Sequence, residues 1–192
     1  MKGKKLTPLM WCHLFLMILL AAASIVSIFL MMFSERSDSF QEYFSILKVG
    51  TYLFALLNAA AMICGILYLT SGYSKRAAGY YKAFIVLAAA FNAVTVYTTI
   101  YSQGFGVGAV MMIVKVLLLL ALAFWPNLGK RNTWILFGIM LAIDLLFGVL
   151  FGSDSSVAVY RLILVLSKLV MDGTIGLAIR GKYQDKDARG TT

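Results

Sequence analysis

The chain is poor in histidine, cysteine, proline and acidic residues. Among its 192 residues there are one histidine, two cysteines, two prolines and eight acidic residues. Cys12 and Cys64 form no CxxC pair, and neither they nor His13 stand at the spacing of a metal-ligand cluster. We therefore expect no metal site and no cofactor, and we expect both thiols to be reduced and buried.

The motifs of membrane enzymes are missing as well. The chain has no HExxH, no GxSG with a histidine partner and no ExxxR. Asp172 and Gly173 begin like a lipid phosphotransferase motif, but the residues 174–176 do not continue it. A lone aspartate and lysine suffice for acid–base chemistry. An intramembrane enzyme is still the least favoured of three function classes.

What the sequence does contain is long runs of apolar residues. Hydrophobic residues make up 61% of the chain, and the mean hydropathy is +0.89. A helix needs about 20 apolar residues to cross a bilayer, and six segments have this length. They are residues 9–33, 44–70, 83–102, 107–125, 133–152 and 157–179. We predict an all-α polytopic membrane protein, with a six-helix transmembrane domain over residues 9–180, an N-terminal segment 1–8 and a polar, mobile tail 181–192.

Charge placement predicts the orientation of these helices. Basic residues collect at alternate breaks between the apolar segments, whereas the other breaks hold acidic residues and only Arg36. The basic set is Lys2, Lys4, Lys5, Lys75, Arg76, Lys82, Lys130, Arg131, Arg180, Lys182, Lys186 and Arg189. By the positive-inside rule both termini are cytoplasmic. The net charge of +9 thus indicates the lipid bilayer as a partner and no nucleic acid. We expect a multi-pass protein of a prokaryotic plasma membrane.

Charged residues also stand inside the apolar segments, where each costs about 3 kcal/mol or more. Arg161, Lys168 and Asp172 follow one another at spacings of seven and four, which places them on one face of a helix. With a rise of about 1.5 Å per residue, Lys168 comes out near the depth of three polar residues on other helices, and Asp172 lies further in. The three are Asn92, Lys115 and Asp144.

This shared depth predicts a polar site near the bilayer midplane. Lys48 and Arg161 lie above it, closer to the outer surface, and give the interior more basic than acidic groups. A cationic vestibule of this kind favours a small anionic or polar solute. Transport is therefore the leading hypothesis, with substrate-binding residues Lys48, Asn92, Lys115, Asp144, Arg161, Lys168 and Asp172.

Each of these residues also has a structural interpretation. Lys168 and Asp172 are four residues apart and would neutralise each other along one helix. Lys115 and Asp144 would form a bond that only joins two helices. Lysine and arginine near the surface reach the headgroups with their charged ends. The alternative is thus an accessory or structural membrane protein, working beside other membrane subunits, whose buried charges pair its helices.

Size and topology are similar to one transporter family. Six helices, a chain of this length and cytoplasmic termini resemble the substrate-binding S-components of energy-coupling-factor vitamin transporters. That family has an AxxxA pattern in its first helix, where this chain has Ala21-Ala22-Ala23 and then Ser27. The resemblance covers size and topology and does not extend to motifs. It implies a subunit that transports only within an ATPase-bearing complex.

Overall fold

The computed structural model describes residues 7–34, 45–71, 75–124, 129–151 and 158–189. Over these ranges the chain is helical throughout and contains no strand, which confirms the predicted all-α class. The helices are α1 (Pro8–Ser34), α2 (Ser45–Thr70), α3 (Lys75–Gln103), α4 (Val107–Phe124), α5 (Lys130–Phe151) and α6 (Ala158–Arg189).

Five helices, α1 to α5, are long and apolar enough to cross a membrane. The mean hydropathy of their apolar stretches runs from 1.3 for α5 to 2.7 for α4. The sixth helix is not among them, because its described part carries Lys168, Asp172 and Arg180. Length and composition therefore allow these five helices to span a membrane. The sixth remains a prediction.

Two helices extend beyond the predicted apolar segments. Helix α3 begins at Lys75 instead of residue 83, and α6 continues to Arg189 instead of ending at residue 179. Both extensions are rich in lysine, arginine and alanine, which are good helix formers outside a membrane as well. The tail is thus helical as far as Arg189, and its mobility stays a prediction. At 32 residues, α6 measures about 48 Å, longer than the roughly 30 Å of bilayer hydrocarbon.

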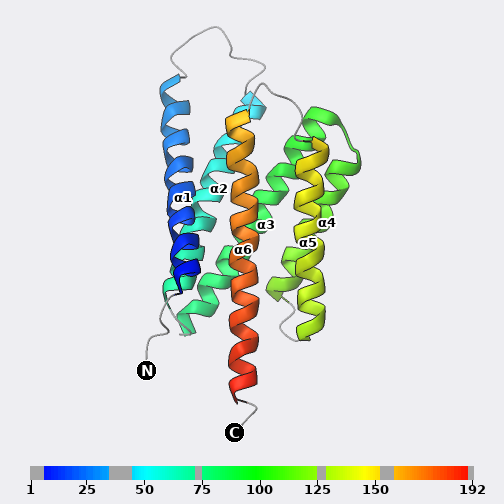
Figure 1. Cartoon of the computed structure of the whole chain (residues 1–192). Helices are drawn as coiled ribbons and strands as arrows, with labels where there is room; N and C mark the ends of the chain where they lie inside the picture. The colour runs from blue at the N-terminus through cyan, green and yellow to red at the C-terminus, as the bar shows by residue number, and fades with distance from the viewer. Residues whose placement is uncertain (1–6, 35–44, 72–74, 125–128, 152–157, 190–192) are drawn as a thin grey trace.

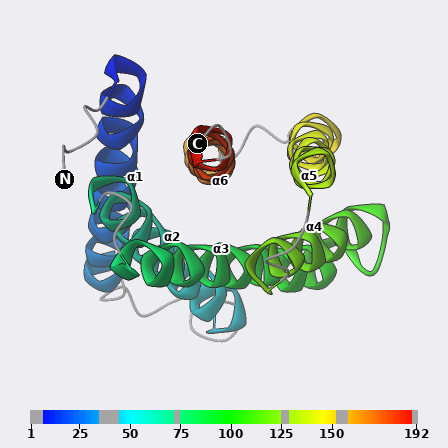
Figure 2. The same ribbon diagram turned by 90° about the horizontal axis from the view of Figure 1, so that it is seen from below.

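The helices form two layers. Helices α1, α2, α3 and α4 follow one another in a curved row, each packed against the next, and α5 and α6 lie together on one side of that row (Figure 2). Helix α5 packs on α4, and α6 packs on α1 and α2. The interior of the protein is the region between the row and the α5–α6 pair.

Small residues allow the helices of the row to approach closely. Ala55, Ala59, Ala61 and Ala89 are buried, as expected for small residues spaced by four on α2 and α3. At Gly65 of α2, an added Cβ atom would lie 3.3 Å from the ring of Phe84 and 2.3 Å from Met17 Cε. The contact of α1, α2 and α3 at this level therefore depends on glycine.

The outer face of the row is apolar. Leu9, Trp11 and Phe15 on α1 are each exposed by 60% or more, which suits contact with lipid tails. Cys12 lies on the same helix and is exposed, whereas Cys64 on α2 is half-buried. The expectation of two buried thiols is therefore wrong for Cys12, because α1 turns a broad face away from the protein.

The first turn of α1 and the last turns of α6 lie at the same end of the bundle (Figure 1). The starts of α3 and α5, at Lys75 and Lys130, are at that end too. Arg180, late in α6, adds to the basic residues there. The bundle thus gathers basic residues at one end, as the charge pattern predicts, and the assignment of that end to the cytoplasm remains a prediction.

Candidate functional site

The interior holds charged side chains that are almost completely removed from solvent. Lys115 on α4 is 1% exposed, Asp144 on α5 is 6%, and on α6 Lys168 is 3% and Asp172 is 1%. These four residues, which we call the charged cluster, come from both layers. A buried charge is costly unless it is paired and hydrogen-bonded, so the partners of each group matter.

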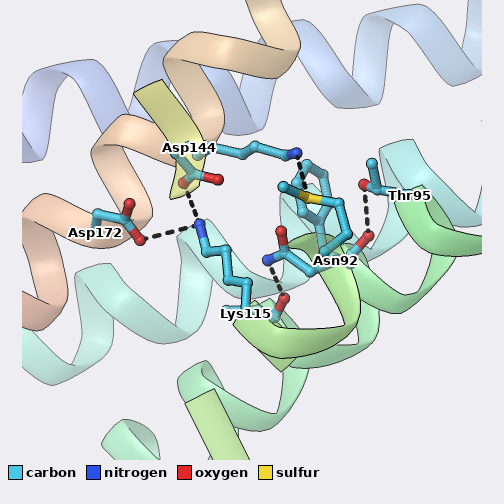
Figure 3. A network of polar contacts seen from close by, with 9 residues as sticks. Asn92, Thr95, Lys115, Asp144 and Asp172 are labelled. Atoms are coloured by element: carbon cyan, nitrogen blue, oxygen red, sulfur yellow. Dashed lines mark hydrogen bonds and ion pairs between the residues drawn. The ribbon is translucent and has the colours of Figure 1, made fainter. Parts of the chain in front are cut away.

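Lys115 connects the two layers. Its ammonium donates to Asp144 Oδ2, and its Nζ lies 3.3 Å from Asp172 Oδ1 (Figure 3). One side chain of α4 therefore holds carboxylates on both α5 and α6. The predicted contact between Lys115 and Asp144 is present. Asp144 Oδ1 and both carboxylate oxygens of Asp172 are buried and make no hydrogen bond within the described residues, so the contact of Lys115 with Asp172 is an ion pair without a hydrogen bond.

Lys168 has much weaker partners. Its Nζ lies 3.3 Å from Met112 Sδ and 4.5 Å from the centre of the Phe147 ring. A thioether sulfur is a weak acceptor, and an aromatic ring attracts a cation without accepting a conventional hydrogen bond. Over the part of the chain that the structure describes, no carboxylate forms an ion pair with Lys168.

The expected neutralisation of Lys168 by Asp172 is thus not the arrangement found. Asp172 faces Lys115 of α4 instead. A lysine four residues before an acidic residue is the less favourable order along a helix. An ammonium arriving from another helix is a better partner, and it leaves Lys168 to the sulfur and the ring.

The charged cluster is balanced. Two lysines and two aspartates have a formal sum of zero when all are ionised. The predicted excess of positive charge therefore rests on Lys48 and Arg161. Their backbones belong to α2 and α6, but their side chains lie outside the described residues. The predicted cationic character of the vestibule therefore remains a prediction, while the four residues of the charged cluster alone carry equal positive and negative formal charge.

Asn92 of α3 also belongs to the interior. It is 1% exposed, its amide donates to the Ala88 carbonyl at 2.8 Å, and its Oδ1 makes no hydrogen bond within the described ranges. The Thr95 hydroxyl, about one turn further along α3, donates a hydrogen bond to the Phe91 carbonyl at 3.2 Å. Figure 3 shows Asn92 reaching into the same region as Lys115. The structure thus brings Asn92, Lys115, Asp144, Lys168 and Asp172 together, as predicted.

A second polar contact joins α6 to α1 and α2. Asn58 Nδ2 donates to Ser24 Oγ at 2.8 Å and to Ser167 Oγ at 2.9 Å. The Ser24 hydroxyl itself donates a hydrogen bond to the Leu20 carbonyl at 2.9 Å. The sequence alone did not single out Ser167. The position of Ser167 beside Lys168, on the inward stripe of α6, was the available signal.

A third polar contact lies between α1 and α6. His13 Nε2 and Thr174 Oγ1 are 2.9 Å apart, and the Thr174 hydroxyl donates to the Val170 carbonyl at 3.0 Å. The hydroxyl therefore accepts from His13 Nε2. Gly173 gives the ring its place, because an added Cβ atom would lie 2.8 Å from His13 Cε1. From the sequence, His13 was noted only for its lack of metal-ligand companions, and this contact was missed.

Helix α6 thus meets the row through polar side chains on three helices, α1, α2 and α4. The chain matches no protein-family model, no curated protein and no solved structure. The likeness to S-components accordingly rests on size and helix number alone. Within the described residues no three histidine, cysteine, aspartate or glutamate side chains converge on one point.

Proposed function

We propose that this chain is an integral membrane protein that carries a small polar solute, as a transporter or as the solute-binding subunit of one. Its site is the charged cluster between the helix row and the α5–α6 pair. Both termini face the cytoplasm, and α6 is the sixth membrane span. The observation that carries the proposal is the burial of the Lys168 ammonium without an oxygen partner among the described residues.

Burial of the Lys168 ammonium costs free energy. An ammonium removed from water loses several kcal/mol that only good partners return. Lys115 has two carboxylates and already joins α4 to α5 and α6, so helix pairing alone has no need of a second lysine. Intramembrane ionisable residues that are expensive to keep commonly mark solute and ion pathways. A solute that supplies an acceptor would offset the cost of Lys168.

The construction of the interior supports movement of the solute. The α5–α6 pair meets the row through polar contacts from Lys115, Asn58 and His13, and also through a shared apolar core. Polar contacts between membrane helices contribute only about 0.6 to 2 kcal/mol each. They can therefore be exchanged for contacts with a polar solute. Separation of the pair from the row is the motion we propose for access.

An accessory protein is the second candidate, favoured by Lys115. This residue bonds carboxylates on two helices, which is what a purely structural charge does. The two functions differ in what they require of Lys168. A structural cluster loses packing when Lys168 is changed, whereas a solute site loses ligand response.

A thermal-shift screen of polar metabolites on the purified protein separates the candidates. The first variant is Lys168→Met, which keeps a side chain of similar length but removes the charge. The control is Lys82→Met, at an exposed lysine of α3. A ligand raises the melting temperature because it binds the folded state only. We expect a polar metabolite to stabilise the wild type and the control but not Lys168→Met.

Two outcomes contradict the proposal. The first is a screen in which no anionic, cationic, zwitterionic or neutral polar metabolite raises the melting temperature of the wild-type protein. The second is a shift that Lys168→Met retains in full, since the ligand would then bind elsewhere.

A further inference from the structure

We propose that the solute is a small zwitterion of the amino-acid type, with an ammonium and a carboxylate in one molecule. This inference rests on the proposed solute site and names the class of its ligand. It follows from the unequal hydrogen bonding of the positive and negative parts of the charged cluster.

Lys168 is the positive part. Its ammonium has three donors, and its partners among the described residues are the Met112 sulfur at 3.3 Å and the Phe147 ring. Neither is an oxygen acceptor. A solute carboxylate would form a charge-assisted hydrogen bond here, which is roughly twice as strong as one between neutral groups. Lys168 therefore selects a carboxylate or another anion.

The two aspartates are the negative part. Lys115 hydrogen-bonds Asp144 Oδ2 and forms an ion pair with Asp172, but Asp144 Oδ1 and both oxygens of Asp172 are buried without a hydrogen bond among the described residues. The buried Asn92 Oδ1 is in the same state. All four atoms are acceptors. An ammonium, which only donates, is the group that satisfies several acceptors at once.

The two parts belong to neighbouring turns of one helix. Lys168 and Asp172 are separated by one turn of α6, so their Cβ atoms are about 5–6 Å apart. Asp144 is held next to Asp172 because both contact Lys115. A zwitterion laid along this turn would place its carboxylate at Lys168 and its ammonium at Asp172.

Net charge separates a zwitterion from the simpler solutes. With all four groups ionised the cluster sums to zero, so an anion would leave one excess negative charge in the interior and a cation one excess positive charge. An uncompensated charge at this depth is costly. A zwitterion supplies both kinds of partner and leaves the sum at zero.

The test compares free amino acids with blocked forms of the same molecules on the wild-type protein. The probes are glycine, serine, glutamine, leucine and phenylalanine. Each is used free, as the N-acetyl derivative that lacks the ammonium, and as the methyl ester that lacks the carboxylate. We expect at least one free amino acid to raise the melting temperature by about 5 °C at roughly a hundred times its dissociation constant. Both blocked forms should have no effect.

Calorimetric titration of the responding amino acid then assigns its two ends. Lys168→Met and Asp172→Asn should each weaken binding by about tenfold or more, the loss of one charge-assisted bond. Lys82→Met should bind like the wild type. The blocked-form comparison uses the wild type, so it decides the question even if Asp172→Asn does not fold.

A response to the N-acetyl form equal to that of the free amino acid would overturn the inference in favour of an anion. An equal response to the methyl ester would overturn it in favour of a cation. The inference is also overturned if none of the five amino acids changes the melting temperature while another metabolite raises it. In these three cases the proposed solute site survives. If no probe in either set acts, the zwitterion and the proposed function fail together.

Discussion

The Lys115 ammonium on α4 lies 3.3 Å from the Asp172 carboxylate on α6. This contact crosses from one layer of the bundle to the other. It turns Asp172 away from Lys168, its neighbour one turn earlier, and so separates the cluster into a bonded part around Lys115 and a weakly bonded ammonium at Lys168. Under the proposed function, Lys115 holds the layers together and Lys168 binds the solute.

Removal of Lys115 should be the most destabilising change in the cluster. Lys115→Met leaves Asp144 and Asp172 buried without their ammonium, and breaking a buried pair in this way costs about 3–5 kcal/mol. Asp144→Asn should cost less, about 1–3 kcal/mol, because Lys115 keeps Asp172. The free energy of unfolding, measured by denaturant titration in detergent, gives the ranking. Equal stability of Lys115→Met and Lys82→Met would contradict the contact.

Gly173→Ala should weaken the joint between α1 and α6. The new methyl group would lie 2.8 Å from His13 Cε1, and the ring cannot withdraw without losing its bond to Thr174. Overpacking of this kind costs about 1–3 kcal/mol. The matched control is Gly138→Ala in α5, where nothing lies within 4 Å of the added atom. The control should be neutral or slightly stabilising, because alanine is the better helix former.

Thermal unfolding of the two glycine variants gives the comparison. Combination of Gly173→Ala with His13→Ala should recover part of the loss, since the smaller side chain removes the clash. Equal melting temperatures for Gly173→Ala and Gly138→Ala would show that His13 does not pack on Gly173.

Asn58 should couple α2 to both α1 and α6. Asn58→Ala loses the hydrogen bonds to Ser24 and Ser167, each worth about 0.6 kcal/mol and at most about 1.7 kcal/mol in a membrane helix bundle. A double-mutant cycle of Asn58→Ala with Ser167→Ala measures the second bond directly. We expect a coupling energy of that size, and strict additivity would argue against the contact.

The orientation of the bundle is tested by reporters fused after Thr192. A fluorescent protein that matures only in the cytoplasm should fluoresce, and a phosphatase that is active only outside should stay silent. This follows from the basic residues at the end of the bundle where α6 finishes. The opposite pair of readings would reverse the proposed topology.

Much of the bundle could be predicted from the sequence, because hydrophobic length is a strong signal. The apolar runs located every helix, and depth along them brought Lys115 to the level of Asp144. The ends of the helices were harder to predict from the sequence. Lys75 and Arg189 lie well outside the apolar runs, where helix formation depends on propensity and packing and hydropathy gives no information.

The contact of Lys115 with Asp144 was predictable from the sequence, but the partner of Asp172 was not. Spacing placed Lys168 and Asp172 on one stripe, yet whether Asp172 meets Lys168 or Lys115 depends on the rotation of α4 against α6. Periodicity does not fix that rotation. Ser167 and Thr174 were missed because serine and threonine occur in membrane helices for many reasons, and only the packed structure shows which of them has a partner on another helix.

The central claim is that Lys168 serves a solute while Lys115 holds the helices together. The most direct test is the melting temperature of wild type, Lys168→Met and Lys115→Met, each with and without the responding solute. We predict that Lys168→Met melts close to the wild type and shows no solute shift, whereas Lys115→Met melts far lower. A Lys168→Met protein that keeps the solute shift, or that is as unstable as Lys115→Met, would contradict the account.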